Sequence, residues 1–189
     1  MSDLDLLIEV AREAGELALD HAARPPEVTQ KPGGAGPVTQ ADLAVDALLH
    51  NRLMSRRSGY GWLSEETPDD HARLNCTRVF IVDPIDGTRA FIEKSKDWAH
   101  AIAVVEAGQV VAGVVYLPAR NALYAAAAGQ GATLNGHPLA VRPAKPLAEA
   151  EVLTTKPNLK PERWQGGRVP FSPKYRSSLA WRLCLVAEG

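Results

Sequence analysis

Four carboxylates in the middle of the chain are the residues most able to do chemistry. Asp83 and Asp86 lie three positions apart in the segment DPIDGT, which follows the apolar run VFIV, and Glu65 and Glu66 lie upstream. Clustered carboxylates repel one another, and a hard cation such as Mg²⁺, which prefers oxygen ligands, relieves that repulsion. The pattern therefore predicts a metal site first and a phosphate-handling site second.

The residues around these carboxylates decide between a metal site and an ordinary polar turn. A lone Asp-x-x-Asp pair is more often a solvated turn than a pair of ligands. Here an apolar run precedes the pair, Gly87 and Thr88 follow it, and Glu65 lies upstream, and this combination favours ligands. The backbone N–H groups of the turn after Asp86 would form a cradle for an anion. Glu66 is open to either role, as a ligand or as a hydrogen-bonding partner behind the ligands.

Two helices and then a series of mostly adjacent strands must position these side chains. Apolar residues at helical spacing predict a helix from Asp3 to Ala23, and Thr39 opens a second helix with Asp42 in a capping box. The run VFIV at 79–82 predicts a short strand buried on both faces. The later patterns predict strands and one Ser178-capped helix over these ranges: strands 98–106, 109–117, 123–127, 132–134 and 151–155, and a helix 179–187. The first two of these strands flank Ala107-Gly108, which predicts a hairpin.

The order of these elements indicates a fold of the α/β class, in the layered α+β sense, rather than a doubly wound Rossmann sheet. Residues 1–142 are expected to form one α+β lobe that carries the metal site, and residues 143–189 to begin a second α/β lobe. Neither a GxGxxG nor a Walker A pattern is present in the sequence. His100 lies in a strand of alternating residues, which favours a structural role.

Composition excludes several other classes of protein. The formal net charge of −1 gives no overall field for a nucleic acid polymer or an acidic membrane surface. No apolar run approaches the roughly 20 residues that cross a bilayer, and the acidic N-terminus lacks the basic region of a secretory signal. Cys76 and Cys184 fit reduced thiols better than a disulfide framework or a zinc site. We therefore expect a cytoplasmic protein with neither a nucleic acid polymer nor a membrane as partner.

The combination of DPIDGT, the apolar strand before it and the upstream glutamates resembles the inositol monophosphatase superfamily of metal-dependent, lithium-sensitive phosphatases. The resemblance covers nearly the whole chain, and three further segments support it: PVTQAD at 37–42, GVVYLP at 113–118 and CLVAEG at 184–189. It implies the αβαβα sandwich of that family, with the second lobe incomplete in this chain. It also implies a homodimer, a requirement for two or three Mg²⁺ ions, and inhibition by Li⁺.

The resemblance also implies roles for individual metal ligands. Glu65 would bind the first metal and help to activate the attacking water, and Asp83 would bridge two metals. The backbone carbonyl of Ile85 would complete the first site, and Asp86 would bind the second metal. Lys31 and Asp42 match positions at the outer edge of this site. Lys31 could instead be a solvated loop lysine, and this simpler interpretation is favoured. Asp42 could instead serve only in the cap of the second helix, and this is about as well supported as a role near the metal.

Substrate contacts follow from the same resemblance. Gly87 and Thr88 would offer backbone N–H groups to the phosphate, and the Thr88 hydroxyl would help to orient the water. Arg89 could contact a second phosphate of the substrate, and Ser178 lies where the family places a serine beside the substrate. Members of the family usually continue to a Trp-Asp-x-Ala-Gly segment whose Asp ligates the second metal. This sequence ends at Gly189 without one, so we expect either a fragment or a shortened protein with an incomplete second site.

The segment RAFI after Thr88 is the best sequence indication of the substrate. It is similar to the nucleotidase-type members, although histidinol-phosphatases share Arg-x-Phe-Ile; inositol-type members more often have Asn-Phe. We therefore expect a Mg²⁺-dependent phosphomonoesterase that acts on a small phosphorylated metabolite. The order of preference is 3'-phosphoadenosine-5'-phosphate, as in a 3'(2'),5'-bisphosphate nucleotidase, then inositol monophosphate, then histidinol phosphate. The alternative from another class is a catalytically inactive metal-binding or assembly module, which the missing C-terminal Asp would explain.

Overall fold

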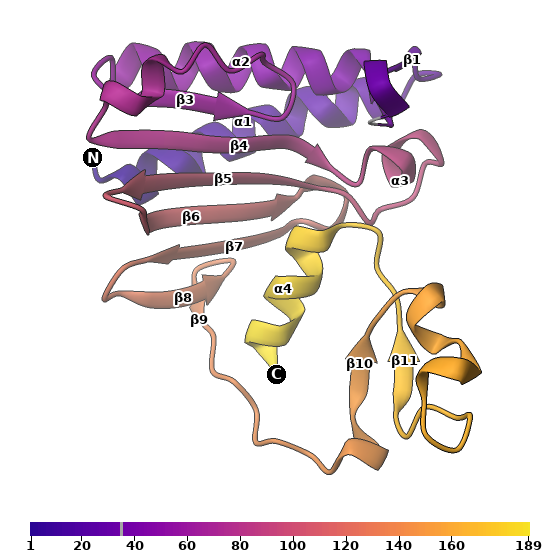
Figure 1. Cartoon of the computed structure of the whole chain (residues 1–189). Helices are drawn as coiled ribbons and strands as arrows, with labels where there is room; N and C mark the ends of the chain where they lie inside the picture. The colour runs from indigo at the N-terminus through magenta and orange to yellow at the C-terminus, as the bar shows by residue number, and fades with distance from the viewer. Residues whose placement is uncertain (35) are drawn as a thin grey trace.

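A seven-stranded sheet with two long helices along one face organises the chain (Figure 1). The structure is a computed structural model and describes residues 1–34 and 36–189. The strand order is β3-β4-β5-β6-β7-β8-β9; β3 and β4 pair in parallel, and each later neighbour pairs antiparallel. The strand bounds are β3 Gly61–Ser64, β4 Arg78–Asp86, β5 Ala99–Glu106, β6 Gln109–Leu117, β7 Ala122–Ala127, β8 Gly131–Leu134 and β9 His137–Pro138. The layered architecture and the β5–β6 hairpin agree with the sequence-based predictions.

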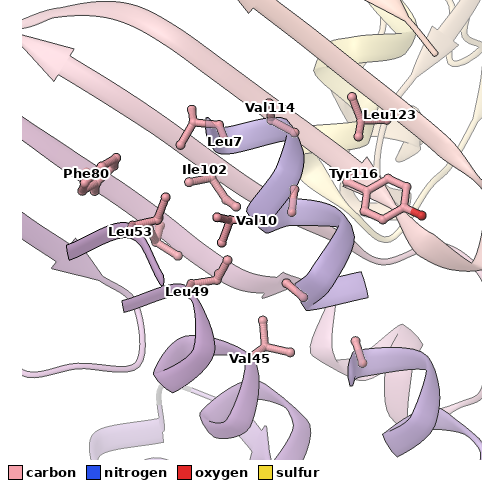
Figure 2. Packing of buried hydrophobic residues seen from close by; sticks show 14 of the residues in the cluster. Leu7, Val10, Val45, Leu49, Leu53, Phe80, Ile102, Val114, Tyr116 and Leu123 are labelled. Carbon is pink, nitrogen blue, oxygen red and sulfur yellow. The ribbon is translucent and has the colours of Figure 1, made fainter. Parts of the chain in front are cut away.

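The two helices begin at capping boxes and turn apolar stripes toward the sheet. α1 spans Asp3–Ala22 and α2 spans Gln40–Arg56, and the predicted box of Thr39 with Asp42 is present at the start of α2. Several of their leucines and valines lie fully buried against the facing side chains of β4, β5 and β6, among them Leu7, Val10, Val45, Leu49 and Leu53 (Figure 2). Burial of one such leucine contributes about 1.5–3 kcal/mol. This core therefore fixes α2, and with it the polar side chains of α2, firmly on the sheet.

β4 is longer than predicted, and only one of its faces is covered. Phe80 is 0% exposed beneath the helices, whereas Ile81, which points to the opposite face, is 41% exposed. The prediction of a strand buried on both faces is therefore wrong, because a continuous apolar run does not distinguish a covered face from an open one. On this second face an apolar cavity of about 510 Å³ lies between the sheet and the last helix; Ile81, Ala103, Val115 and Leu183 are among its lining residues.

The remaining elements are a helix on the second face of the sheet, two separate strand pairs and a short helix after β4. α4 spans Leu179–Glu188 and packs on the second face through Trp181, which contacts a small cluster with Leu117 and Tyr124. β10 (Glu151–Leu153) and β11 (Ser172–Lys174) form a separate parallel pair, and β1 (Val28–Gln30) and β2 (Pro37–Thr39) form an antiparallel pair before α2. α3 (Thr88–Ile92) is a short helix after β4. In the part of the chain that the structure describes, no helix is long and apolar enough to cross a membrane.

Candidate metal centre

The carboxyl ends of β3 and β4 meet at one edge of the sheet, which brings the sequence-predicted ligands together. The two strands run parallel with Ser64 opposite Val82. Glu65 and Asp83, the next residue of each strand, therefore lie next to each other at the end of this pairing. The Glu65 N–H donates to the Val82 carbonyl at 3.1 Å and extends this pairing by one residue. Parallel pairing therefore places side by side two carboxylates that lie far apart in the sequence.

The pairing of β4 with β5 is irregular between Asp83 and Asp86, where the predicted ligand loop lies. The carbonyl oxygen of Pro84 in this loop hydrogen-bonds to Nδ1 of His100, which is fully buried. Burial lowers the pKa of His100 to about 4, so the ring is neutral at pH 7 and Nδ1 acts as the donor. The structural role expected for His100 is confirmed, since its ring holds the loop between the two aspartates.

Repulsion between carboxylates is strong at this edge. Burial, followed by the charges of Glu65 and Asp86, raises the pKa of Asp83 to about 8. Burial also raises the pKa of Glu66, because it outweighs the effect of the neighbouring Lys31. A carboxyl group that keeps its proton near neutral pH indicates a local deficit of positive charge. Burial supplies the larger part of the effect on Asp83, and the charges of Glu65 and Asp86 supply the part that the spacing of the acids predicts.

Lys31 supplies part of the missing positive charge. Its ammonium group forms ion pairs of 2.8 Å with Glu65 and 2.8 Å with Glu66, and its side chain is only 16% exposed. Burial alone would lower the pKa of Lys31, but the hydrogen bonds to the two glutamates outweigh it and raise that pKa. The favoured interpretation of Lys31 as a solvated loop residue is therefore wrong. The contact of Lys31 with Glu65 joins residues 34 positions apart, and the Gly- and Pro-rich loop around Lys31 gave no sequence signal for it.

Asp86 lies on the side of the loop that faces α4. Its Oδ2 accepts hydrogen bonds from the Ser178 hydroxyl at 2.6 Å and from the Ala180 N–H at 2.7 Å. The Ser178 hydroxyl also accepts from the Trp181 N–H at 2.9 Å, as the cap of α4 that the sequence predicted. Ser178 is completely buried, and Ser177 lines the nearby cavity in its place. Asp86 thus uses one oxygen to anchor α4, which leaves Oδ1 as the atom suited to a metal ion.

The turn after Asp86 requires glycine and places a hydroxyl beside a buried acid. Gly87 has φ +102°, and a Cβ atom there would lie 3.0 Å from the Asp97 carbonyl oxygen. The Thr88 hydroxyl lies 3.1 Å from Oδ1 of Asp42 and 3.2 Å from the Ile85 carbonyl oxygen. Burial raises the pKa of Asp42 against the opposing effect of its hydrogen bonds to Thr39. Asp42 is therefore both part of the capping box of α2 and a neighbour of the predicted site.

A cavity of about 390 Å³ opens in front of these residues. Its lining contains four predicted site residues together with others that the sequence analysis did not single out: Glu65, Gly87, Thr88, Arg89, Glu93, Tyr175 and Ser177. Tyr175 lies in the irregular stretch before α4, where no periodicity marked it. The cavity is polar along the turn and has an exposed aromatic ring at its rim. A small anionic molecule with an organic part fits this combination of surfaces.

The donor set suits a hard divalent cation. Glu65, Asp83, Asp86 and the Ile85 carbonyl are all oxygen donors, which Mg²⁺ prefers. As the side chains stand, no group of three or more His, Cys, Asp or Glu residues within 1–34 and 36–189 could hold a metal ion. The raised pKa of Asp83 and the ion pairs of Lys31 both indicate that these acids require a positive charge. The residues therefore fit Mg²⁺ in chemistry, and the side chains must adjust to bind it.

Comparisons with known proteins identify the family of the chain. The profile of the inositol monophosphatase family matches residues 2–189. The 3'(2'),5'-bisphosphate nucleotidase CysQ of Escherichia coli O157:H7 is 35% identical over 130 residues, which cover 67% of this chain and 52% of that protein. The histidinol-phosphatase of Chlorobaculum parvum is 37% identical over 139 residues, which cover 74% of this chain and 53% of that protein.

A solved structure shows the same fold over the full length of this chain. The IMPase of Thermotoga maritima has a TM-score of 0.87 and 27% identity, and the match covers 100% of this chain and 74% of that one. The chain thus spans about half the length of the curated relatives it matches and about three quarters of this structure. The family profile, the fold and the arrangement of acids around the β4 loop lead to one conclusion: the chain belongs to the inositol monophosphatase family.

Proposed function

We propose that this chain carries the catalytic site of a Mg²⁺-dependent phosphomonoesterase that acts on a small phosphorylated metabolite. One observation carries the proposal. Glu65, Asp83 and Asp86 gather at one edge of the sheet, and the Gly87-Thr88 turn adjoins them at a cavity large enough for a small ligand. Acids that need a cation, beside a turn suited to an anion, are the elements that phosphate ester hydrolysis requires.

Glu65, Asp83, the Ile85 carbonyl and Asp86 would hold the Mg²⁺. When bound, Mg²⁺ neutralises charge on the phosphate oxygens and makes water a better nucleophile. Asp83 must lose its proton before it can act as a ligand, because its pKa lies above neutral pH. Lys31 must also release Glu65 at least in part, since both would compete for the same carboxylate.

Thr88 and Asp42 would move the proton of the attacking water. The Thr88 hydroxyl can pass its proton to Asp42 Oδ1 over 3.1 Å while it accepts a proton from the water. The resulting hydroxide attacks phosphorus, the ester P–O bond breaks, and the leaving alkoxide takes a proton from solvent. Burial raises the pKa of Asp42, which suits this carboxylate to hold a proton during the step. The backbone N–H groups of Gly87 and Thr88 would bind the phosphate oxygens.

The proposed substrate is 3'-phosphoadenosine-5'-phosphate. Arg89 is exposed at the cavity and could pair with a second phosphate, while Tyr175 at the rim offers a ring to a base. The likeness to CysQ supports this choice. Inositol monophosphate and histidinol phosphate are the second and third candidates, supported by the likeness to an IMPase and to a histidinol-phosphatase. A homodimer, as implied by the family, remains part of the proposal.

Release of inorganic phosphate from the three substrates, with and without Mg²⁺, tests the proposed function. Asp83→Asn removes one proposed ligand without changing the size of the side chain, and Asp20→Asn makes the same change at an exposed position of α1. We expect Mg²⁺-dependent release from the wild type and from Asp20→Asn, and a loss of at least about 100-fold in Asp83→Asn. Metal binding without release from any substrate would refute catalysis by this chain and favour the metal-binding module.

Arg89 offers a separate test of the substrate. The ratio of kcat/KM for 3'-phosphoadenosine-5'-phosphate to that for 3'-AMP measures the contribution of the second phosphate. Arg89→Ala should lower this ratio by about tenfold, whereas Lys96→Ala, which removes another exposed cation, should leave it unchanged. An equal loss on both substrates in Arg89→Ala would show that Arg89 does not contact the second phosphate.

A further inference from the structure

Helix α2 carries a second buried carboxylate, Asp46, one turn after Asp42. Residues four positions apart lie on the same face of a helix, so both acids point from α2 toward the edge of the sheet where the site lies. Asp42 contacts Thr88 after β4, whereas Asp46 contacts the segment after β3. The proposed mechanism uses Asp42 and leaves Asp46 without a role.

Both carboxylate oxygens of Asp46 accept hydrogen bonds from the segment that carries Glu65 and Glu66. Oδ1 accepts from the Ser64 hydroxyl at 2.5 Å, and Oδ2 accepts from the Thr67 hydroxyl at 2.6 Å. The Ser64 hydroxyl in turn accepts from the Glu66 N–H at 3.3 Å. The two glutamates therefore lie between two hydroxyl groups that a single side chain holds.

The two hydrogen bonds of Asp46 are strong, and the helix that carries Asp46 is held firmly in the core. Hydrogen bonds to an ionised acceptor are roughly twice as strong as those between neutral groups. Asp46 is 8% exposed, so water competes little for its oxygens, and the neighbouring Val45 and Leu49 are completely buried against the sheet. A movement of the Ser64–Thr67 segment would have to break these two bonds or displace α2 from the core.

We propose that Asp46 is a positioning residue of the metal centre: by holding Ser64 and Thr67, it fixes the direction of Glu65 and Glu66. Both of its oxygens are already in use, so it acts through this segment rather than as a ligand. The metal affinity of the site then depends on a residue that contacts neither metal nor substrate. This affinity rests on the proposed function, whereas the ordering of the segment by Asp46 does not.

Three variants separate the possible roles of Asp46. Asp46→Ala removes both acceptors. Asp46→Asn keeps one acceptor for Ser64 and presents an N–H₂ group to the Thr67 hydroxyl, which can rotate to accept. Asn51→Ala is the control, since it alters an exposed position of the same helix.

Two measurements on the full chain give the result. Calorimetric titration with Mn²⁺, which takes the same oxygen ligands as Mg²⁺, gives the affinity. Amide hydrogen exchange of Glu65 and Glu66 in the metal-free protein gives the order of the segment. For Asp46→Ala we expect about tenfold weaker Mn²⁺ binding and about tenfold faster exchange of the Glu66 amide. Asn51→Ala should remain close to the wild type in both, and Asp46→Asn should lie between the wild type and Asp46→Ala, because its neutral amide keeps the hydrogen bonds but makes them weaker.

Two outcomes would overturn the proposed role of Asp46. Unchanged exchange in Asp46→Ala overturns the proposal, and so does an Asp46→Asn variant as impaired as Asp46→Ala, because charge rather than hydrogen bonding would then be responsible. If the wild type binds no Mn²⁺, the proposed function fails in this chain, while exchange still tests Asp46. If Asp46→Ala does not fold, Thr67→Val removes one of the two hydroxyls at a less buried position and should accelerate exchange of Glu66 by a smaller factor.

Discussion

The free energy of unfolding of the metal-free protein should fall by about 1.5 kcal/mol when the pH rises from 6.5 to 8. Asp83 is the cause, because its pKa is about 8 in the folded protein, against 3.8 for a freely solvated aspartate such as the unfolded chain presents. Over this interval the folded state binds a proton that the unfolded state has already lost. The stability that this proton provides is complete below about pH 4 and is lost as the pH rises through 8.

His100 limits the pH range in which the effect is visible. Its pKa falls from 6.5 to about 4 on burial, so its contribution is complete above pH 6.5 and is lost as the pH falls toward 4. The two residues therefore act in opposite directions between pH 4 and 6.5, each at up to about 1.4 kcal/mol per pH unit. Above pH 6.5 the effect of Asp83 remains without this opposition.

Urea denaturation in EDTA at pH 6.5, 7, 7.5 and 8 measures this decline. Asp83→Asn should abolish it, and saturating Mg²⁺ should reverse it, since the metal binds the ionised form and its stabilising effect grows as Asp83 loses its proton. Calorimetry at pH 7 should accordingly detect about 0.9 proton released for each metal bound. A wild type with the same stability at pH 6.5 and 8, or an equal decline in Asp83→Asn, would refute the reasoning.

Three substitutions test other parts of the site. Lys31→Met removes two ion pairs of 2.8 Å and should lower the stability of the metal-free protein by about 1–3 kcal/mol. It should also increase the shift in melting temperature that Mg²⁺ causes, and an equal shift in the variant and the wild type would contradict this account. Ser178→Ala removes the cap of α4 and a hydrogen bond to Asp86, and should cost about 1–2 kcal/mol in urea denaturation, whereas Ser177→Ala should cost little. Gly87→Ala forces a side chain into a left-handed turn against the Asp97 carbonyl and should cost more than about 1 kcal/mol in thermal denaturation; unchanged stability would mean that the turn adapts freely.

The sequence was informative wherever local physics decides the structure. The capping box of Thr39 and Asp42, the β5–β6 hairpin and the Ser178 cap all depend on residues a few positions apart, and all three are confirmed. The apolar run before Asp83 correctly indicated a strand. The prediction that this strand is buried on both faces was wrong, because the exposure of Ile81 depends on which elements cover the second face.

The acids of the candidate site could be picked out from the sequence, and the residues that hold them in place much less so. Glu65, Asp83 and Asp86 were recognisable as acids clustered around a turn. Lys31 lies in a loop without periodicity, and no neighbouring residue distinguishes it from a solvated lysine. Its contact with Glu65 joins residues 34 positions apart. Asp46 resembles any polar residue on a helix, and its contact with Ser64 depends on the packing of α2 against β3. Tyr175 reaches the cavity only through the path of the irregular stretch before α4.

The parallel pairing of β3 with β4 makes the spacing of the acids independent of the chain that connects them. Glu65 and Asp83 are held by the register of Ser64 with Val82, and residues 68–77 connect the strands beyond the Ser64–Thr67 segment that Asp46 holds. Much of this connection is exposed, including Asp70 and Leu74. Lengthening such a surface loop costs little free energy. A fluorescent reporter domain inserted at Asp70 should therefore leave the arrangement of Glu65 and Asp83 intact, which makes this connection a suitable place to build a sensor for a ligand of the candidate site.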